Sequence, residues 1–479
     1  MKLEFLRPFI KYLPEVKLPG RHVVFKEKLL WTSLALILFF VMGIIYPYGV
    51  TVEKLEQSIS GFSQLQLIFA SSMGSIISAG IGPIVTASII LQLLAGAEMI
   101  DIDLKKPEGK ALYQGTQKIL TIVIAFFEAG ALVIATHMVD TLVENPAGNY
   151  WAVDWPLRIF TIMQIAIGSI LLMYMDEVVS KWGIGSGISL FIAGGVAQTI
   201  VTATINPLRE ASGQFAGIIP SFLEQMMSGN FNILVLLPVF ATLFVFLIVS
   251  FGESMRLEIP LSYGGIRGVG GRYPLRFFYV SNIPVILASA MLANVQMFAG
   301  VFGVDINSPS QSMSTLQKVV YTFASSVTLG NLQGFLLNIF DPTMWGQFTD
   351  PQVLMHLAIY LVVFISLCVL FGKFWVSTTG LESEAVAKQI QDGGMQIPGF
   401  RRDYRIIKMV LDRYIPQITI ISSIAVGLVA AGADLVVAIG SGTGLLLTVG
   451  ILYRLYEEIQ KEQMAGVSPW IRKMMGREE

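Results

Sequence analysis

Long uncharged apolar runs alternate with short polar segments along almost the whole chain. A run of about 20 apolar residues is long enough to cross the hydrocarbon core of a bilayer as a helix. The runs in this chain predict an all-α polytopic membrane protein with ten spanning helices. The predicted spans are residues 29–48, 74–96, 118–138, 157–175, 186–204, 232–251, 278–299, 353–375, 415–437 and 442–460.

The second of these spans is interrupted near its start by Gly80 to Pro83. A glycine and proline break is tolerated in a membrane helix where it packs on protein or lines a cavity, and not where it faces lipid. Residues Gly61 to Met73, directly before the span, are apolar but too short to cross the membrane. We therefore expect a re-entrant or interfacial segment, a break, and then a full span.

The distribution of basic residues supports the count of ten spans and orients them. Short cytosolic loops carry an excess of lysine and arginine. With the N-terminus placed in the cytosol, nearly all of the 32 basic residues fall in the inner segments. The exceptions are Lys54, Arg158, Arg209 and Lys318. A miscounted span would scramble this alternation, so both termini are predicted to be cytosolic.

Composition is that of a membrane protein. The chain has 479 residues, of which 54% are hydrophobic and 14% charged, whereas soluble domains carry about 25% charged residues. A single cysteine, Cys368, excludes an intramolecular disulfide framework. The N-terminal residues lack the uninterrupted apolar core of a secretory signal peptide. We divide the chain into a cytosolic amphipathic arm (1–28), an N-terminal half (29–204), a C-terminal half (205–460) with cytosolic loops at about 252–277 and 376–414, and a cytosolic tail (461–479).

The two halves carry an internal repeat. Ile81 to Val85 in the second span resembles Asn282 to Ile286 in the seventh, and the G-x-G-x-G spacing of Gly183 to Gly187 recurs at Gly440 to Gly444. Both matches are offset by five spans, an odd number, so the halves would be inverted relative to each other. Short glycine and proline matches are common in membrane helices, but two matches at one offset favour a real repeat. Inverted repeats with interrupted spans point to a pathway at the repeat interface.

The long loops differ between the two sides. The outer loop at about 300–352 contains an apolar stretch, Leu316 to Leu329, that is expected to form a surface helix. The cytosolic loops after the sixth and eighth spans carry most of the exposed basic charge. They form the predicted docking surface.

The residues of an enzyme, a pump or a metal site are not evident in the sequence. We find no G-x-x-x-x-G-K-[ST] loop, and His22, His137 and His356 do not have the spacing of metal ligands. No catalytic residue, cofactor or metal is therefore expected. Glu128 is the clearest charge in the middle of a predicted span, and Asp434 lies near the end of the ninth span. A charge in this position is either functional or bonded to a neighbouring helix, and the sequence leaves both alternatives open.

Aliphatic pairs beside the glycine breaks suggest an apolar pathway. Ile81 and Val85 share one helix face, as do Ile188 and Ile192. A ring of such side chains would exclude water and ions without any charge. Ordinary helix packing is the alternative for each pair. An inverted-repeat secondary transporter would need polar groups at the midplane, and a membrane scaffold without a conduit stays open at this point.

Seven long motifs resemble the SecY family, the α subunit of the Sec protein-conducting channel, in its archaeal and eukaryotic-type branch. The resemblance covers residues 14–457. The motifs are PEVKLPGRHVVFKEK, GIGPIVTASIILQLL, DEVVSKWGIGSGISLFIAGGVAQTI, EIPLSYGG followed by RGVGGRYPLRFFYVSNIPVIL, GMQIPGFR, DRYIP and GSGTGLLLTVGILYRLYE.

This resemblance implies an hourglass-shaped channel sealed by an apolar pore ring and a plug. The plug would occupy about residues 60–72, before the second span. The implied ring residues are Ile81, Val85, Ile188, Ile192, Ile286 and Leu447. The implied plug residues are Phe62, Leu65, Leu67, Ile68 and Phe69.

The resemblance also implies a lateral gate and a set of partners. The gate would open between spans 2 and 3 on one side and spans 7 and 8 on the other, with Thr86, Gln92, Glu128 and Asn282 as its polar cluster. Arginines of the cytosolic loops would contact ribosomal RNA. These docking residues are Arg267, Arg272, Arg276, Arg401 and Arg402. A SecE-type (gamma) subunit, a SecG or Sec-beta-type subunit, the ribosome, nascent chains with their signal sequences, and the lipid bilayer are the implied partners.

The predicted function is that of a passive, gated channel in the cell membrane. It would pass unfolded secretory proteins across the membrane and release apolar segments sideways into lipid.

Overall fold

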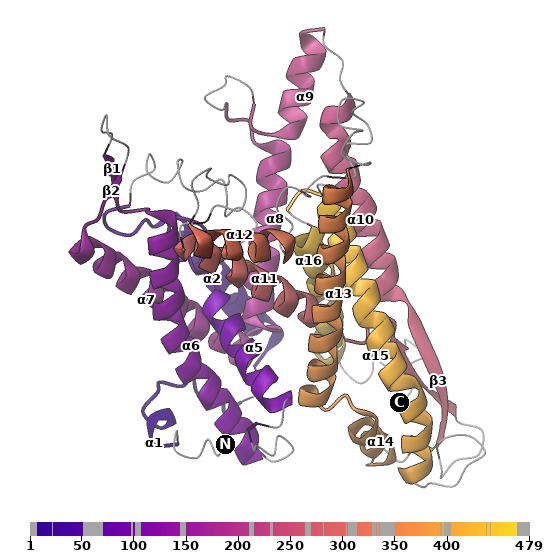
Figure 1. The fold of residues 1–479 in the computed structure, drawn as a ribbon. Helices are drawn as coiled ribbons and strands as arrows, with labels where there is room; N and C mark the ends of the chain where they lie inside the picture. Colours follow the sequence, from indigo (N-terminus) through magenta and orange to yellow (C-terminus); the bar gives the residue numbers. More distant parts are fainter. Residues whose placement is uncertain are drawn as a thin grey trace.

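Long helices run side by side through the molecule in the computed structural model (Figure 1). The structure describes residues 7–21, 23–50, 70–96, 99–100, 107–143, 150–209, 215–229, 233–263, 270–280, 282–302, 304, 314–327, 332, 335, 350–392, 395–396, 404–436, 438–440 and 442–466.

A helix occupies the place of each predicted span. Eight helices in the described part of the chain are long and apolar enough to cross a membrane. The shorter α5 and the C-terminal α16 take the second and tenth places. The ten helices are α2 (Phe25–Ile44), α5 (Gly82–Gly96), α6 (Pro107–Thr136), α7 (Trp155–Trp182), α8 (Gly187–Ile205), α10 (Leu237–Ser254), α11 (Ile283–Val301), α13 (Pro351–Thr379), α15 (Tyr404–Leu435) and α16 (Gly442–Gly466).

Short elements cap the two ends of this bundle. We call the end with the β3–β4 hairpin the hairpin side and the opposite end the α12 side (Figure 1). On the hairpin side lie α1 (Arg7–Ile10), β3 (Arg256–Tyr263), β4 (Gly270–Arg276), α14 (Ser383–Asp392) and β5 (Met395–Gln396). On the α12 side lie β1 (Thr141–Val143), β2 (Tyr150–Ala152), α9 (Ile218–Met227), η3 (Ile233–Leu236) and α12 (Thr315–Val327).

Three local features differ from, or add to, the sequence predictions. Helix α5 begins at Gly82 rather than Gly74, because Gly80 has a left-handed backbone (φ +53°) that a helix cannot contain. In the described part of the predicted amphipathic arm, only the short α1 and the first turn of α2 are helical. Helix α12 lies within the outer loop, where a surface helix was predicted.

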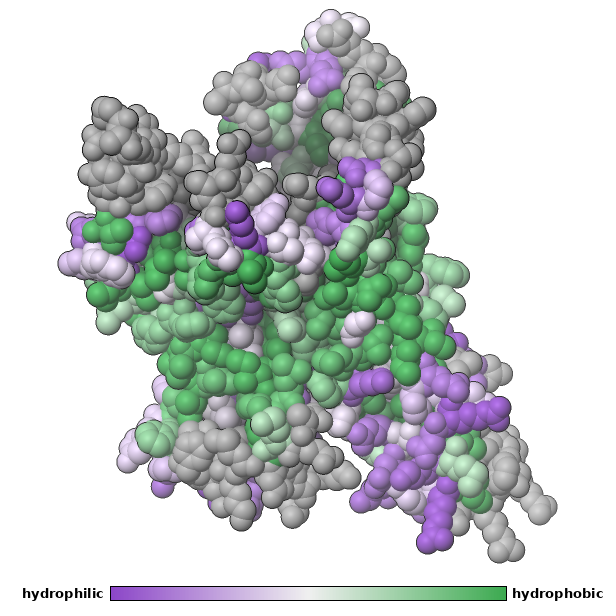
Figure 2. Space-filling view, in the orientation of Figure 1, coloured by the Kyte–Doolittle hydropathy of each residue, from purple (hydrophilic) through white to green (hydrophobic). Residues whose placement is uncertain are grey.

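The outer surface of the bundle is apolar over a broad belt. Figure 2 shows this green belt, with purple and white surface toward both ends. Large aliphatic and aromatic side chains on the outer faces of the helices are exposed, which a soluble protein would avoid over so wide an area. Examples are Leu34, Ile37, Val41, Ile159, Met163, Ile167, Leu243, Phe244 and Leu247. This belt fits the hydrocarbon core of a bilayer, and the chain is a multi-pass membrane protein.

The N-terminal and C-terminal helices form two halves that meet along two seams. Helices α2, α5, α6 and α7, indigo to purple, lie on one side of Figure 1, and α13 to α16, orange to yellow, on the other. On the first seam α5 contacts α11 and α13, and α6 contacts α11; on the second, α16 contacts α8 and α2. A single large core of buried aliphatic and aromatic side chains connects the two halves.

The two long loops on the hairpin side join in one small sheet. Strands β3 and β4 pair antiparallel, with Arg256 opposite Arg276. Strand β5, from the loop after α13, adds to the other edge of β3, with Ser262 opposite Gln396. The loops that follow the sixth and eighth spans are therefore one structural unit, which their sequences did not predict.

Candidate functional site

Six aliphatic side chains expected in a pore ring come together in the core. They are contributed by the beginnings of four helices and by the residue just before α5. Five of them are buried members of one cluster, and the sixth, Ile188, packs against it. These five side chains have little exposed surface, between 0% and 8% of each. The six are Ile81, Val85, Ile188, Ile192, Ile286 and Leu447.

Prolines place two of the four helix starts in the same way. Pro83 and Pro284 each lie in the first turn, where a missing backbone N–H costs no helical hydrogen bond. Val85 and Ile286 each follow their proline by two residues. The two side chains therefore occupy corresponding positions in the inverted halves.

Aspartates from neighbouring helices cap the other two starts. The backbone N–H of Ile188 donates to Asp176 Oδ1 of α7 (2.8 Å). In the second half, Gly442 N–H donates to Asp434 Oδ1 of α15 (2.6 Å), and the Thr443 hydroxyl donates to Asp434 Oδ2 (2.6 Å). A carboxylate at this position accepts from otherwise unpaired N–H groups and complements the helix dipole. Of the two charges predicted in spans, Asp434 therefore holds the start of α16.

These caps fix how the two glycine motifs correspond. Gly185 and Gly440 both have left-handed backbones (φ +74° and +83°), and each precedes its helix start by two residues. At both starts a Cβ would come within 3 Å of the capping helix, which explains the glycines Gly187 and Gly442. In the structure Gly185 corresponds to Gly440, whereas the sequence motifs aligned Gly183 with Gly440, so the structural match is displaced by two residues. It makes Ile192 and Leu447 equivalent, each five residues into its helix.

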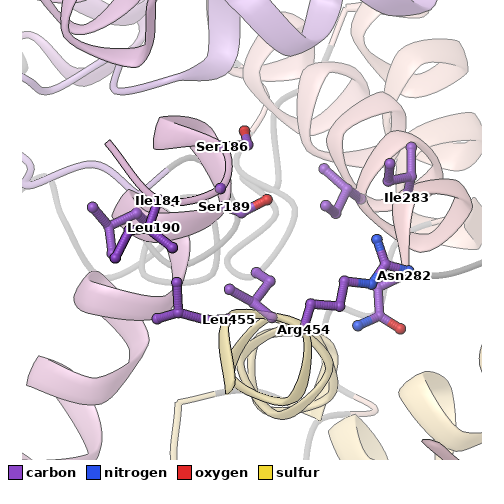
Figure 3. Close-up of a pocket in the computed structure, with 11 residues that line it drawn as sticks. Ile184, Ser186, Ser189, Leu190, Asn282, Ile283, Arg454 and Leu455 are labelled. Carbon is purple, nitrogen blue, oxygen red and sulfur yellow. The ribbon is translucent and has the colours of Figure 1, made fainter. Parts of the chain in front are cut away.

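Cavities flank the closed ring. One of about 140 Å³ on the hairpin side lies between α8, α11 and α16, and Ile286 of the ring forms part of its wall. Figure 3 shows Arg454 of α16 extending toward Asn282 at this cavity. A second, of about 370 Å³, reaches Ile188 beneath the N-terminal arm. A third, of about 310 Å³, lies further along α8, beside Ala70 to Ser72. The first two cavities therefore reach the ring, at Ile286 and at Ile188.

A buried polar chain crosses the first seam. The Asn294 side-chain amide of α11 donates to the Thr86 hydroxyl of α5 (2.9 Å), which donates to Glu128 Oε1 of α6 (2.6 Å). Glu128 is almost completely buried, so this hydrogen bond is made without competing water. Beside it, the exposed rings of Phe127 and Phe298 meet with centroids 5.7 Å apart. The seam is held by weak, local contacts between α5, α6 and α11.

The other two residues of the expected gate cluster lie elsewhere. Gln92 donates to Ser88 within its own helix (3.0 Å). Asn282 donates to the Leu446 carbonyl of α16 (3.4 Å), and a Cβ on Gly450 would collide with it. Asn282 therefore fastens α11 to α16 and does not join the Thr86 chain.

Most of the expected plug lies outside the described residues, including Phe62, Leu65, Leu67, Ile68 and Phe69. Its end is described from Ala70. The Ser72 hydroxyl donates to the Gly43 carbonyl of α2 (3.0 Å), and Ile76 N–H donates to the Ile45 carbonyl (2.9 Å). The segment before α5 is thus attached to the end of α2.

The expected docking arginines are described only in part. Arg267, Arg401 and Arg402 lie outside the described residues, and Arg272 is described only as a backbone member of β4. The Arg276 side chain forms an ion pair with Glu457 of α16, and Arg256 pairs with the same carboxylate (3.1 Å). Arg276 is therefore held against the bundle.

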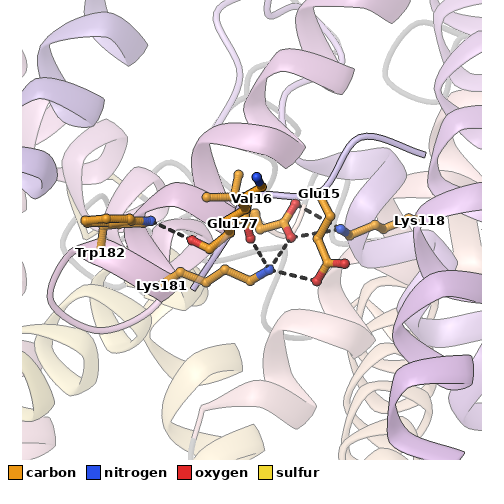
Figure 4. A network of polar contacts seen from close by, with 7 residues as sticks. Glu15, Val16, Lys118, Glu177, Lys181 and Trp182 are labelled. Carbon is orange, nitrogen blue, oxygen red and sulfur yellow. Dashed lines mark hydrogen bonds and ion pairs between the residues drawn. The ribbon is translucent and has the colours of Figure 1, made fainter. Parts of the chain in front are cut away.

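Ionic contacts attach the N-terminal arm to α6 and α7. Lys181 of α7 binds Glu15 (2.9 Å), the Val16 carbonyl and Glu177, and Glu177 also binds Lys118 of α6 (Figure 4). The hydrogen bond and charge of Lys181 hold the pKa of Glu15 below its ordinary value. The arm consequently covers the cavity that reaches Ile188.

A second ionic group lies on the α12 side. Asp140 is fully buried and accepts hydrogen bonds from Arg158 Nε (2.8 Å) and from a terminal nitrogen of the same guanidinium. His137 Nδ1 lies 2.8 Å from Asp140 Oδ2, the oxygen that this terminal nitrogen also binds. Arg158, one of the four outer basic residues, is therefore a structural residue that joins α7 to the end of α6.

Sequence reasoning missed Asn294, Asp176 and Phe298. Asn294 is a polar residue within an apolar run, and this contrast was the signal in the sequence that could have identified it. Asp176 precedes the G-x-G-x-G motif, and its spacing from the helix start gave no hint of a cap. Phe298 could not be distinguished from other lipid-facing aromatics.

Comparison with known proteins agrees with this architecture. A SecY family model matches residues 75–456. The protein translocase subunit SecY of Methanothermobacter thermautotrophicus is 43% identical over 99% of both chains. A solved structure of a protein conducting channel is 40% identical, with a TM-score of 0.79, over 97% of this chain and 98% of the other. Sec61 in the canine ribosome–channel complex from the endoplasmic reticulum is also 40% identical, with a TM-score of 0.76, over the same shares.

Both the family match and the identity to the archaeal relative extend across the helices that build the ring, the seams and the hairpin-side sheet. The chain therefore belongs to the SecY family of protein translocase subunits.

Proposed function

We propose that this chain is the pore-forming subunit of a protein translocase, a passive gated channel for unfolded polypeptides. The observation that carries the proposal is the closed aliphatic cluster at the starts of α5, α8, α11 and α16, with cavities approaching it. Branched aliphatic side chains offer no directional hydrogen bonds. They close around a moving chain without binding it and exclude ions by dewetting.

We propose that apolar segments leave through the first seam. The Asn294–Thr86 hydrogen bond and the Phe127–Phe298 contact cross this seam, so they must part when it opens. Interhelical hydrogen bonds in membranes contribute only about 0.6 kcal/mol each. Contacts of this strength suit a gate that opens for a signal sequence and closes again.

The partners and orientation also belong to the proposal. The hairpin side would face the cytosol of a cell whose plasma membrane holds the chain, and both termini would lie there. The β3–β4–β5 sheet would dock on the ribosome. The Sec61 relative is found in a ribosome–channel complex, which supports a ribosome as partner. SecE-type (gamma) and SecG or Sec-beta-type subunits would complete the assembly.

Residues 60–72 would act as the plug. Their described end is attached to α2 beside the cavity of about 310 Å³, on the side of the ring away from the β3–β4 hairpin. A secondary transporter is disfavoured, because the side chains beside the helix breaks are Ile, Val and Leu rather than polar groups.

Site-specific crosslinking tests the pathway. A photoreactive residue is placed in turn at positions 81, 85, 188, 192, 286 and 447 of the channel, which is then loaded with a stalled secretory chain. We expect crosslinks from these positions to the chain. Matched probes at Leu452 and Val362, which are exposed on the outside of α16 and α13, should give none before the gate opens. Crosslinks confined to the lipid-facing probes would overturn the proposal.

A further inference from the structure

Helix α12 has three distinct faces. Val320 and Ala324 are on a buried face that packs with Ala299 and Val304 at the end of α11. Lys318 and Thr322, one turn apart, are exposed on a polar face. Between these two faces lies an exposed apolar stripe, which a helix packed only on protein would not show. The stripe consists of Leu316 (59% exposed), Val319 (66%) and Phe323 (61%).

The helix is held firmly in this orientation. Ser314 and Gln317 form a reciprocal capping box, in which each backbone N–H donates to the other side chain (3.3 and 3.0 Å). The Gln317 side-chain amide also donates to the Phe302 carbonyl at the end of α11 (3.1 Å). Helix α12 contacts α13 as well. It therefore connects two helices on the C-terminal side of the first seam.

The position of α12 indicates what covers the apolar stripe. The helix lies across the bundle, close to the edge of the apolar belt, with polar surface above it (Figures 1 and 2). Apolar side chains are also exposed at the adjoining ends of the helices that it contacts: Phe302, directly after α11, and Met355, near the start of α13. The stripe is thus continuous with the surface that faces the bilayer.

We propose that α12 is an interfacial helix whose apolar stripe is inserted in the bilayer leaflet on the α12 side. Helices that lie in this plane bury their apolar face about 5–10 Å below the headgroups. Lys318, beside the stripe, reaches the lipid phosphates, and Thr322 faces water. Because α12 is fastened to α11 and α13, this leaflet holds one side of the first seam at a fixed depth.

Fluorescence quenching in liposomes tests the proposal. The complete complex is prepared with a bimane label on Val319→Cys or Phe323→Cys, and the buried Cys368 is left in place. The matched controls are Thr322→Cys, on the polar face of the same helix, and Val362→Cys, on the exposed surface of α13. Quenchers are lipids brominated on the acyl chain and aqueous iodide. An unchanged melting temperature shows that each labelled complex is folded.

We expect brominated lipid to quench labels at positions 319 and 323, with the strongest effect from bromine close to the headgroups. Iodide should quench the label at 322, and deeply brominated lipid the label at 362. Iodide quenching at 319 and 323 equal to that at 322 would show that the stripe faces water. Protection from both quenchers would show that a protein covers it. Either result overturns the proposal.

Discussion

Asp434, near the end of α15, accepts a 2.6 Å hydrogen bond from the backbone N–H of Gly442, the first residue of α16. Asp176 of α7 does the same for Ile188 in the first turn of α8. The ring residues Ile192 and Leu447 follow these capped starts by the same number of residues. The inverted repeat therefore reuses one device, a carboxylate from the preceding helix, to position one ring residue in each half.

Loss of either cap should destabilise the channel. We expect Asp434→Ala and Asp176→Ala each to lower the free energy of unfolding by about 1–3 kcal/mol, because buried N–H groups lose their acceptor. Thermal unfolding of the reconstituted complex measures this. The control is Asp412→Ala, an exposed aspartate of α15, which should change little. If all three variants lower the free energy of unfolding equally, the two caps do not contribute more than an exposed aspartate.

Polar substitution in the ring should make the closed channel leak. Leu447→Asn places an amide among aliphatic side chains where Leu447 is now fully buried. Hydration of that amide favours a wetted pathway. We expect a higher ion conductance of the resting channel and acceptance of weaker signal sequences. Leu452→Asn, on the exposed face of the same helix, is the control, and its conductance should stay at the wild-type level.

Removal of the polar chain should ease gate opening. Asn294→Ala deletes the donor to Thr86, so the closed gate loses about 0.6 kcal/mol, or about threefold in its equilibrium with the open gate. Insertion of signal sequences with graded hydrophobicity measures the shift. Thr204→Val is the control, since the Thr204 hydroxyl donates to Ile200 of its own helix. A threshold that does not move in Asn294→Ala would contradict the assignment of this seam as the gate.

The ion pair at Asp140 should make stability depend on acidity. Burial favours a higher pKa for Asp140, but hydrogen bonds from Arg158 and His137 hold the pKa below its ordinary value of 3.8. The unfolded chain therefore takes up this proton at a higher pH than the folded chain. The Asp140 ion pair therefore contributes its full share of the free energy of unfolding above about pH 5. This contribution declines as the pH falls through the ordinary pKa of the unfolded chain toward the lower pKa of the folded chain.

Asp140→Asn tests this dependence. At neutral pH the free energy of unfolding of the variant should be about 3–5 kcal/mol lower than that of the wild type, because the substitution leaves the buried Arg158 charge uncompensated. Its melting temperature should also fall less than that of the wild type between about pH 5 and pH 3. Asp154→Asn keeps an effective cap on α7 and should retain the wild-type slope. The same slope in all three proteins would count against the ion pair as its origin.

Release of the N-terminal arm should expose it to protease. Lys181→Ala removes the contacts to Glu15, Val16 and Glu177 together. We expect trypsin to cleave faster after Lys17 and Arg21 in this variant. Mass spectrometry of the fragments measures the cleavage rate. Lys408→Ala breaks an exposed ion pair with Glu384 and should leave the cleavage rate unchanged. If both variants are cut at the wild-type rate, other contacts hold the arm.

Local signals in the sequence were enough for the architecture. Runs of apolar residues predicted the spanning helices, and the repeated glycine and proline positions predicted the two inverted halves. Both signals lie in short stretches of neighbouring residues and can therefore be recognised without the fold. The aliphatic pairs beside the breaks were recognisable for the same reason. The start of α5 was misplaced at Gly74, since hydropathy does not detect that Gly80 takes a left-handed backbone.

Contacts between distant segments were decided by the tertiary structure alone. Thr86 meets Glu128 across 42 residues of sequence and Asn294 across 208, whereas Asn282 turns to α16. The sequence alone determined which segments cross the membrane and which side chains are apolar. Packing of the helices decided which polar groups face one another, because hydrogen-bond partners depend on helix rotation and depth that composition does not specify.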